Sequence, residues 1–290
     1  MGARYRYASL TKMLTAQAVL DAMEQASLPL ETPLSHFITA VNGAKDRRWS
    51  QVTVERLLTH SAGFDRLHSP DPMTLHAVTP WCPGNLDRLK AVMLDFDPGS
   101  GYGYSNLTYC LLGVVLESLS GKSYRAVMQD HFDLAAYGIQ FVDGPYLHDE
   151  VQYDFRHAGF YTDDYYRYLD FSALSSSAGL SGSALGLARL LADLSSKKRL
   201  ALAREFPSGS CDPAAKMSCY GNAMFFYQKP DSALSVWVQQ GYVFGTSALA
   251  LLDDRGGLLI WLGNGAPARG SGADIMLDDI YARLAELYEQ

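Results

Sequence analysis

The stretch Tyr7-Ala8-Ser9-Leu10-Thr11-Lys12, close to the start of the chain, opens the segment around which the fold is predicted to form. Downstream of it, apolar residues recur at helical spacing, at positions 13, 14, 16, 19, 20 and 23. The pattern stops at Ser27-Leu28-Pro29, where the proline ends the periodicity. The sequence therefore predicts an apolar helix from Thr11 that carries the serine and the lysine at its opening turn.

Ser9 and Lys12 are a candidate nucleophile and base. Side chains three positions apart on a helix share one face, with Cβ atoms roughly 5–6 Å apart, which lets the amine take the hydroxyl proton. Amide groups at the helix N-terminus would stabilise negative charge on a bound acyl group. Ser195 and Lys198 repeat the spacing at the polar end of another predicted helix, a context that favours solvated surface.

A second candidate cluster is Tyr104-Ser105-Asn106, which lies between a glycine-rich turn at 97–101 and a predicted helix from Asn106 to Leu119. A tyrosine at such a junction can protonate a leaving group, and an asparagine beside it can hold an amide. Tyr220-Gly221-Asn222 repeats the pattern at the start of a strand-like segment, where a structural role is favoured.

The remaining periodicity predicts helices and strands in separate blocks. A short helix is expected over 52–60, a helix capped by Ser183 continues to the basic residues 197–199, and an amphipathic helix closes the chain over 275–287. Short β-type runs lie at 223–227, 234–239, 248–252 and 258–262. Residues 141–172 show no period and are predicted to be irregular. Together the blocks predict an antiparallel β-sheet flanked by helices, with a mainly helical insertion.

Composition argues against several classes of function. The 290 residues carry 24 Lys and Arg against 31 Asp and Glu, a net charge of −7, and no dense basic stripe, which argues against nucleic acid as a partner. No apolar run approaches the ~20 residues that a membrane helix needs. Histidines and cysteines show no metal-ligand spacing, so neither a metal nor an organic cofactor is predicted. The sequence sets no oligomeric state.

The four cysteines leave two alternatives open. The simplest disulfide pairing joins Cys82 to Cys110 and Cys211 to Cys219, and the other alternative is four free thiols. The first residues contain no secretory h-region. The sequence nevertheless begins abruptly, with the strand-like stretch Tyr5-Arg6-Tyr7 almost at its first residue, which favours a removed leader or a truncated chain. The expected compartment is periplasmic or extracellular after removal of a leader that this sequence does not contain, with a cytoplasmic location as the alternative.

In order along the chain, the motifs resemble those of the serine β-lactamase and penicillin-binding-protein superfamily, nearest to class C β-lactamase-like esterases and peptidases. The matching stretches are Tyr7 to Lys12, Leu57-Leu58-Thr59-His60-Ser61-Ala62-Gly63, Pro98-Gly99 through Asn106, Ala178-Gly179-Leu180-Ser181, and Leu258 to Asn264. The resemblance implies an α/β fold of the β-lactamase/transpeptidase type, in which an antiparallel sheet flanked by helices adjoins a mainly helical lobe.

The same resemblance implies roles for individual residues. Ser9 would be the acylated nucleophile, Lys12 its proton acceptor, and Tyr104 the proton relay to the leaving group. Asn106 would contact a substrate amide, and the backbone N–H groups of Ser9 and Tyr242 would form the oxyanion hole.

Two departures from the family pattern change these expectations. The third family motif has Lys or His, then Thr or Ser, then Gly, and the matching positions here are Gln239-Gln240-Gly241. Gln239, Gly241 and Tyr242 are the substrate-binding residues expected on this strand. Losing the cation removes an anchor for a substrate carboxylate, which disfavours efficient turnover of β-lactams or D-Ala-D-Ala peptides. The usual N-terminal strands are also missing, which predicts an exposed sheet edge unless something covers it.

The predicted organisation has an α/β sheet lobe from residues 1–45 and 186–290, a helical lobe from 46–185, and the site between them. The predicted function is hydrolysis of a small ester or amide through an acyl-enzyme on Ser9. A D-Ala-type peptidase or weak β-lactamase is the nearest alternative, and a catalytically silent sensor or scaffold belongs to another class. His60 is expected to be a buried structural histidine. The tyrosine-rich stretch 161–168 either lines a cleft or fills the helical lobe.

Overall fold

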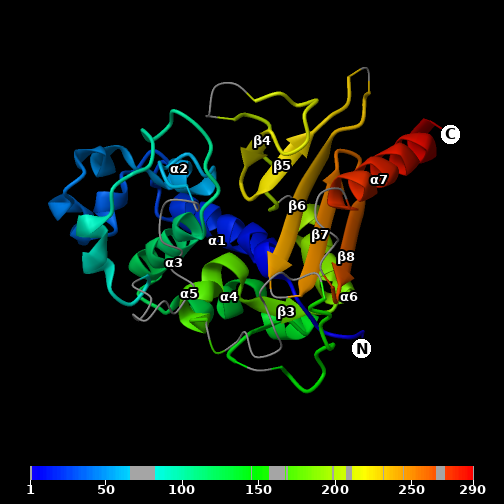
Figure 1. The fold of residues 1–290 in the computed structure, drawn as a ribbon, viewed down its shortest axis with the longest axis horizontal. Helices are drawn as coiled ribbons and strands as arrows, with labels where there is room; N and C mark the ends of the chain where they lie inside the picture. The colour runs from blue at the N-terminus through cyan, green and yellow to red at the C-terminus, as the bar shows by residue number, and fades with distance from the viewer. Residues whose placement is uncertain are drawn as a thin grey trace.

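Helices and a five-stranded antiparallel sheet dominate the structure (Figure 1). It is a computed structural model and describes residues 2–65, 82–144, 146–156, 167, 169–197, 199–206, 211–230, 232–243, 245–265 and 272–289. The helices are α1 (Thr11–Gln25), α2 (Val54–Leu58), α3 (Asn106–Ser120), α4 (Tyr124–Phe132), α5 (Phe171–Ala178), α6 (Ala184–Ser196) and α7 (Gly272–Glu289). The strands are β1 (Tyr5–Arg6), β2 (Gln140–Phe141), β3 (Leu180–Gly182), β4 (Cys219–Gly221), β5 (Met224–Tyr227), β6 (Val236–Val243), β7 (Thr246–Asp253) and β8 (Leu258–Gly263). Short 3₁₀ helices are η1 (Ala8–Leu10), η2 (Leu34–His36), η3 (Thr39–Gly43), η4 (Arg47–Gln51), η5 (Leu86–Ala91) and η6 (Leu134–Tyr137).

The large sheet has the strand order β4-β5-β6-β7-β8, and each neighbouring pair is antiparallel. Successive side chains of a strand point to opposite faces. On one face, Val238 and Leu251 pack against α7, which covers the sheet in Figure 1; on the other, Trp237 and Ala250 belong to the core that includes α1. This alternation places Gln239 and Gly241 of β6 on the α1 face.

A small second sheet, with the order β1-β3-β2, lies next to the start of α1. Tyr5 pairs with Gly182 and Arg6 with Ser181, which ties the first residues of the chain to the segment before α6. The strand-like stretch expected near Tyr5 is therefore observed, whereas β2 was not predicted. Two-residue strands have no periodicity that a sequence could reveal.

Helix α1 is central because it is buried on all sides from Thr11 to Val19. It begins at Thr11, as predicted, but Ser9 lies in the preceding 3₁₀ turn η1 and not in the helix itself. Helix α3 begins at Asn106 because the Ser105 hydroxyl accepts a hydrogen bond from the backbone N–H of Leu107 at 3.2 Å. It ends at Gly121, whose φ of +67° is a left-handed conformation that glycine adopts without strain.

The predicted α/β fold with an antiparallel sheet is confirmed, and two boundaries are corrected. Helix α5 starts at Phe171, inside the segment 141–172 that was predicted to be irregular, because Asp170 caps it by accepting the Ala173 N–H at 2.8 Å. Helix α7 begins at Gly272, three residues earlier than predicted. Both disulfides, Cys82–Cys110 and Cys211–Cys219, are formed, so the alternative of free thiols is excluded.

Strand β8 is an edge strand. Within the described ranges its ladder partner is β7, along residues 258–263. Among the helices whose residues are described, none is long and apolar enough to cross a membrane.

Candidate active site

The 3₁₀ turn η1 and the first turn of α1 together bring a hydroxyl, an amine and a phenol into contact. Ser9 Oγ lies 2.7 Å from the Tyr104 hydroxyl, and Lys12 Nζ donates to Ser9 Oγ at 3.1 Å. Ser9 and Lys12 share a helix face, as their spacing requires. Tyr104 comes from the loop that enters α3, 95 residues further along the chain. The three groups therefore form one hydrogen-bonded chain with Ser9 at its centre.

Lys12 is fully buried, and its amine faces three acceptors. Nζ donates to Ser9 Oγ, to Asn106 Oδ1 at 2.9 Å, and to the backbone carbonyl of Ser177 at 2.9 Å. The nitrogen also lies 5.0 Å from the centre of the Tyr104 ring. An ammonium group has three donors, and here each has an acceptor. Lys12 is thus oriented toward the nucleophile and away from solvent.

The Ser177 carbonyl is a site group that the sequence did not indicate. It belongs to α5, in a run of serines with no motif of its own, and a backbone oxygen has no side-chain signature. Asn106 also makes a contact that the sequence did not indicate, since its Oδ1 accepts from Lys12 Nζ. Its expected contact with a substrate amide stays a prediction.

Strand β6 closes the other side of Ser9. Gln239 is 2% exposed, and its Nε2 donates to the Ser9 carbonyl at 3.3 Å. A Cβ on Gly241 would lie 2.7 Å from the Tyr7 carbonyl and 3.1 Å from the Ser9 nitrogen, so only glycine allows the strand this close. The Tyr242 side chain is 47% exposed and belongs to the opposite face of the sheet. Any contribution of Tyr242 to the site therefore comes from its backbone.

The residue before Ser9 has an unusual backbone conformation. Ala8 is buried and has a φ of +49°, in the left-handed region. For a non-glycine residue this conformation costs about 1–3 kcal/mol and persists only where the surrounding structure imposes it. The candidate nucleophile therefore follows a turn that its neighbours hold in place.

His60 packs against the ring of Tyr104. It is fully buried, its Nδ1 lies 2.8 Å from the Thr108 hydroxyl, and its ring centre is 4.4 Å from that of Tyr104. The His60 carbonyl accepts the Gly103 N–H at 2.9 Å. Burial, with the nearby Lys12 charge, lowers the pKa of His60 well below its usual range. The predicted structural histidine is therefore neutral and holds the loop that carries Tyr104.

The two competing motifs differ in their location: Ser195 lies at the end of α6, whereas Tyr220 packs against His60 beside Tyr104. Ser195 is exposed at the end of α6, and Lys198 is outside the described residues. Tyr220 lies in β4, with its ring centre 4.9 Å from that of His60. The tyrosine-rich stretch 161–168 lies outside the described residues apart from Arg167, so both interpretations of it stay open. Within the described ranges, no cluster of three or more His, Cys, Asp or Glu side chains could hold a metal ion.

Comparison with known proteins identifies the family. The Beta-lactamase family model matches residues 2–280. A Dichelobacter nodosus protein named as a fimbrial assembly protein (FimD, serogroup D) is 36% identical over all of this chain and 73% of its own length. Esterase EstB of Burkholderia gladioli is 32% identical over 43% of this chain and 34% of its own length. The chain therefore belongs to the Beta-lactamase family.

A solved structure agrees with this fold. The beta-lactamase/D-alanine carboxypeptidase of Yersinia pestis superimposes with a TM-score of 0.74 at 17% identity, over 99% of this chain and 84% of that protein. At this identity the likeness shows the fold alone. The relative named as an esterase is a hydrolase by that name, whereas the name of the fimbrial relative describes an assembly role.

Proposed function

We propose that this protein is a serine hydrolase that forms an acyl-enzyme on Ser9 and hydrolyses a small ester or amide. The observation that carries the proposal is the chain of contacts from Lys12 Nζ to Ser9 Oγ to the Tyr104 hydroxyl, at 3.1 and 2.7 Å. A nucleophile with a base and an acid both within hydrogen-bond reach is the arrangement that acyl transfer requires.

The position of Lys12 suits a base. When its nitrogen is neutral, the two remaining N–H groups can stay on Asn106 Oδ1 and the Ser177 carbonyl. The lone pair then points toward Ser9 Oγ and receives its proton as Oγ attacks the substrate carbonyl carbon. Tyr104 donates a proton to the leaving group as the bond to that group breaks. A water molecule then attacks the acyl-enzyme carbonyl carbon and gives a proton to the Tyr104 phenolate. As the ester bond breaks, Lys12 returns its proton to Ser9 Oγ, which restores all three groups.

The motif Gln239-Gln240-Gly241 on β6 favours substrates that carry no carboxylate. Gln239 stands where the family pattern has a cation, and its amide is used on the Ser9 carbonyl. A neutral amide offers no charge to a carboxylate group of a β-lactam or of a peptide C-terminus. The preferred substrates are therefore uncharged acyl donors, with D-Ala-type peptides and β-lactams as poorer ones.

Covalent labelling tests the proposal. Incubation with a fluorophosphonate, followed by intact-mass and peptide mass spectrometry, is expected to give one adduct on Ser9. The adduct is expected to be absent in Ser9→Ala and unchanged in Ser195→Ala, the serine of the competing motif. An unmodified chain with fluorophosphonates and activated esters alike would refute the proposed activity.

A catalytically silent scaffold is the second candidate, favoured by the name of the fimbrial relative. Its specific expectation is an intact fold with no Ser9 adduct. If the adduct forms, comparing a short-chain p-nitrophenyl ester, a chromogenic cephalosporin and a D-Ala-terminated peptide separates the enzymatic alternatives. A cephalosporin rate above the ester rate would contradict the argument from Gln239.

A further inference from the structure

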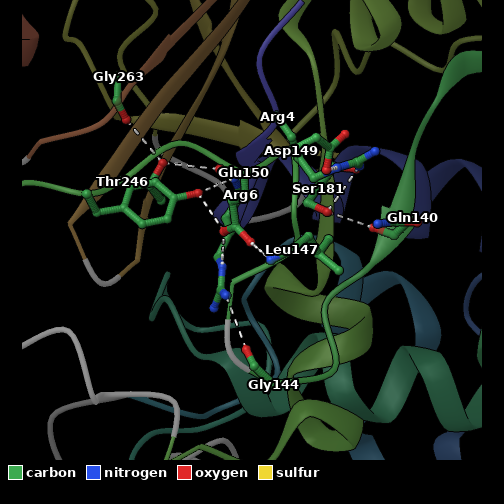
Figure 2. Close-up of polar contacts among 11 residues, drawn as sticks. Arg4, Arg6, Gln140, Gly144, Leu147, Asp149, Glu150, Ser181, Thr246 and Gly263 are labelled. Carbon is green, nitrogen blue, oxygen red and sulfur yellow. Dashed lines mark hydrogen bonds and ion pairs between the residues drawn. The ribbon is translucent and has the colours of Figure 1, made fainter.

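A buried ion pair lies three residues before Ser9. Arg6 Nε contacts Glu150 Oε1 at 2.6 Å, and the two side chains are only 2% and 0% exposed (Figure 2). Removing two charges from water is costly, and apolar side chains of similar volume often give equal or greater stability. A fully buried pair at this place therefore calls for an explanation beyond stability.

The Arg6–Glu150 pair is part of a larger set of hydrogen bonds that centre on the Glu150 carboxylate. The Tyr153 hydroxyl donates to Glu150 Oε1 at 2.8 Å and accepts the backbone N–H of Arg6 at 2.9 Å. The Leu147 N–H donates to the second Glu150 oxygen at 2.9 Å. Burial, with the nearby Glu150 charge, raises the pKa of Tyr153, so its hydroxyl keeps the proton that it donates. Arg6, Glu150 and Tyr153 are called the Arg6 cluster below.

Arg6 is held at its side chain and at both backbone groups. Its guanidinium also donates to the Gly144 carbonyl at 3.2 Å, and its own carbonyl accepts from the Thr246 hydroxyl at 3.2 Å, as Figure 2 shows. Thr246 lies at the start of β7 and Gly144 in the segment after β2. Segment 144–156, strand β7 and, through the pairing of Arg6 with Ser181, strand β3 therefore converge on Arg6.

Arg6 is separated by only one residue from Ala8, the residue with the left-handed backbone before Ser9. After Arg6, the Tyr7 N–H donates to the Leu180 carbonyl at 2.9 Å, and Ala8 then adopts its φ of +49°. The Tyr7 carbonyl and the Ser9 nitrogen both lie against Gly241 of β6. Because a left-handed alanine relaxes unless both sides are held, fixing Arg6 fixes where the Ser9 N–H and hydroxyl point.

We propose that the Arg6 cluster is a positioning device, which holds the Ala8–Ser9 turn so that the Ser9 hydroxyl and N–H keep their reactive geometry. The proposal rests on the proposed function for its catalytic part. Its structural part, the rigidity of the turn, is independent of that function. The opposing interpretation is that the cluster stabilises segment 144–156 without any effect on Ser9.

The test uses Tyr153→Phe, which deletes one hydroxyl, and the double variant Arg6→Met/Glu150→Leu, which deletes both charges. The matched control is Asp149→Asn. Asp149 pairs with Arg4, the residue just before β1, at 2.8 Å, but its side chain is 41% exposed. Thermal unfolding and circular dichroism establish that each variant is folded. If Tyr153→Phe does not fold, the double variant takes its place, because it leaves no buried charge unpaired.

The first readout is hydrogen–deuterium exchange at the amides of residues 7–10, which requires no activity and leaves out the Arg6 amide that Tyr153→Phe deprives of its own acceptor. Exchange there is expected to rise about tenfold or more in the cluster variants, the factor that one lost hydrogen bond to a charged group implies. It is expected to stay at the wild-type rate in Asp149→Asn. Equal exchange in wild type and cluster variants would overturn the proposal, whether or not the protein is a hydrolase.

The second readout is the kinetics of Ser9 acylation by an activated ester. The cluster variants are expected to lose about tenfold or more in kcat with little change in KM, because misplacing a nucleophile affects the reacting atoms and not substrate binding. Increased exchange with unchanged kcat would refute the positioning role. A wild-type chain that is never acylated refutes the proposed function instead, and the exchange data still decide whether the cluster holds the turn.

Discussion

Replacing Tyr104 with phenylalanine is expected to separate catalysis from stability. The change removes the hydroxyl that lies 2.7 Å from Ser9 Oγ and retains the ring. The ring keeps its contact with His60, 4.4 Å between centres, and its place 5.0 Å from Lys12 Nζ. Ser9 Oγ keeps its hydrogen bond to Lys12. The unfolding free energy is therefore expected to fall by about 1 kcal/mol, the value of one hydrogen bond.

The kinetic loss is expected to depend on the leaving group. A general acid contributes about 10²–10⁴ in rate when the leaving group needs a proton. An alkyl ester or amide needs that proton, whereas p-nitrophenolate leaves without one. Tyr104→Phe is therefore expected to lose about 10²–10⁴ in kcat/KM on an alkyl ester and much less on the matching p-nitrophenyl ester.

The assay compares both esters of one short acid, with acylation followed by stopped flow and stability by denaturant unfolding. Tyr288→Phe in α7, which removes one hydrogen bond to Asp253 Oδ2 at 2.6 Å, is the control and is expected to leave both rates unchanged. An alkyl ester loss below about tenfold, or equal losses on the two esters, would refute the assignment of Tyr104 as the acid.

Three further predictions concern the substrate, the disulfide and a buried carboxylate. Gln239→Lys is expected to lower KM for carboxylate-bearing substrates relative to neutral esters, because it adds the missing cation; steady-state kinetics with both substrates measures this. Replacing Cys82 and Cys110 with serine is expected to lower the unfolding free energy by about 3.5 kcal/mol, since the disulfide closes a 28-residue separation; denaturant unfolding measures this. Hydrogen bonds from Arg48 lower the pKa of Asp46 to about 2, so its stabilising effect, about 2 kcal/mol, is complete above pH ~4 and is lost as the pH falls toward 2; unfolding of wild type and Asp46→Asn across this range measures it.

Each of these predictions has a contradicting outcome. An unchanged KM for the charged substrate in Gln239→Lys would show that another group meets the carboxylate. Equal stability of the serine double variant and the wild type would show that the disulfide does not limit the unfolded chain. An Asp46→Asn variant whose stability falls between pH ~4 and 2 as steeply as the wild type would assign the acid sensitivity to other carboxylates.

The local features of this protein follow from the sequence alone. Ser9 and Lys12 share a helix face because three positions is nearly one turn, and the Ser105 and Ser183 caps set where α3 and α6 begin. Strand alternation places Gln239 and Gly241 on one face. Each of these rests on interactions among residues only a few positions apart, which the order of residue types encodes directly.

Which groups from distant parts of the chain contact Ser9 and Lys12 is determined by the tertiary structure. The Tyr104 hydroxyl comes from 95 residues away, and Glu150 meets Arg6 across 144 residues. The Ser177 carbonyl that holds Lys12 is a backbone atom, which any residue type would supply equally. Gln239 was predicted as a substrate-binding residue because it stands where the family pattern has a cation. Its hydrogen bond to the Ser9 carbonyl, however, depends on how closely β6 packs against η1. Such contacts arise from packing of the whole chain, and no spacing within the sequence reports them.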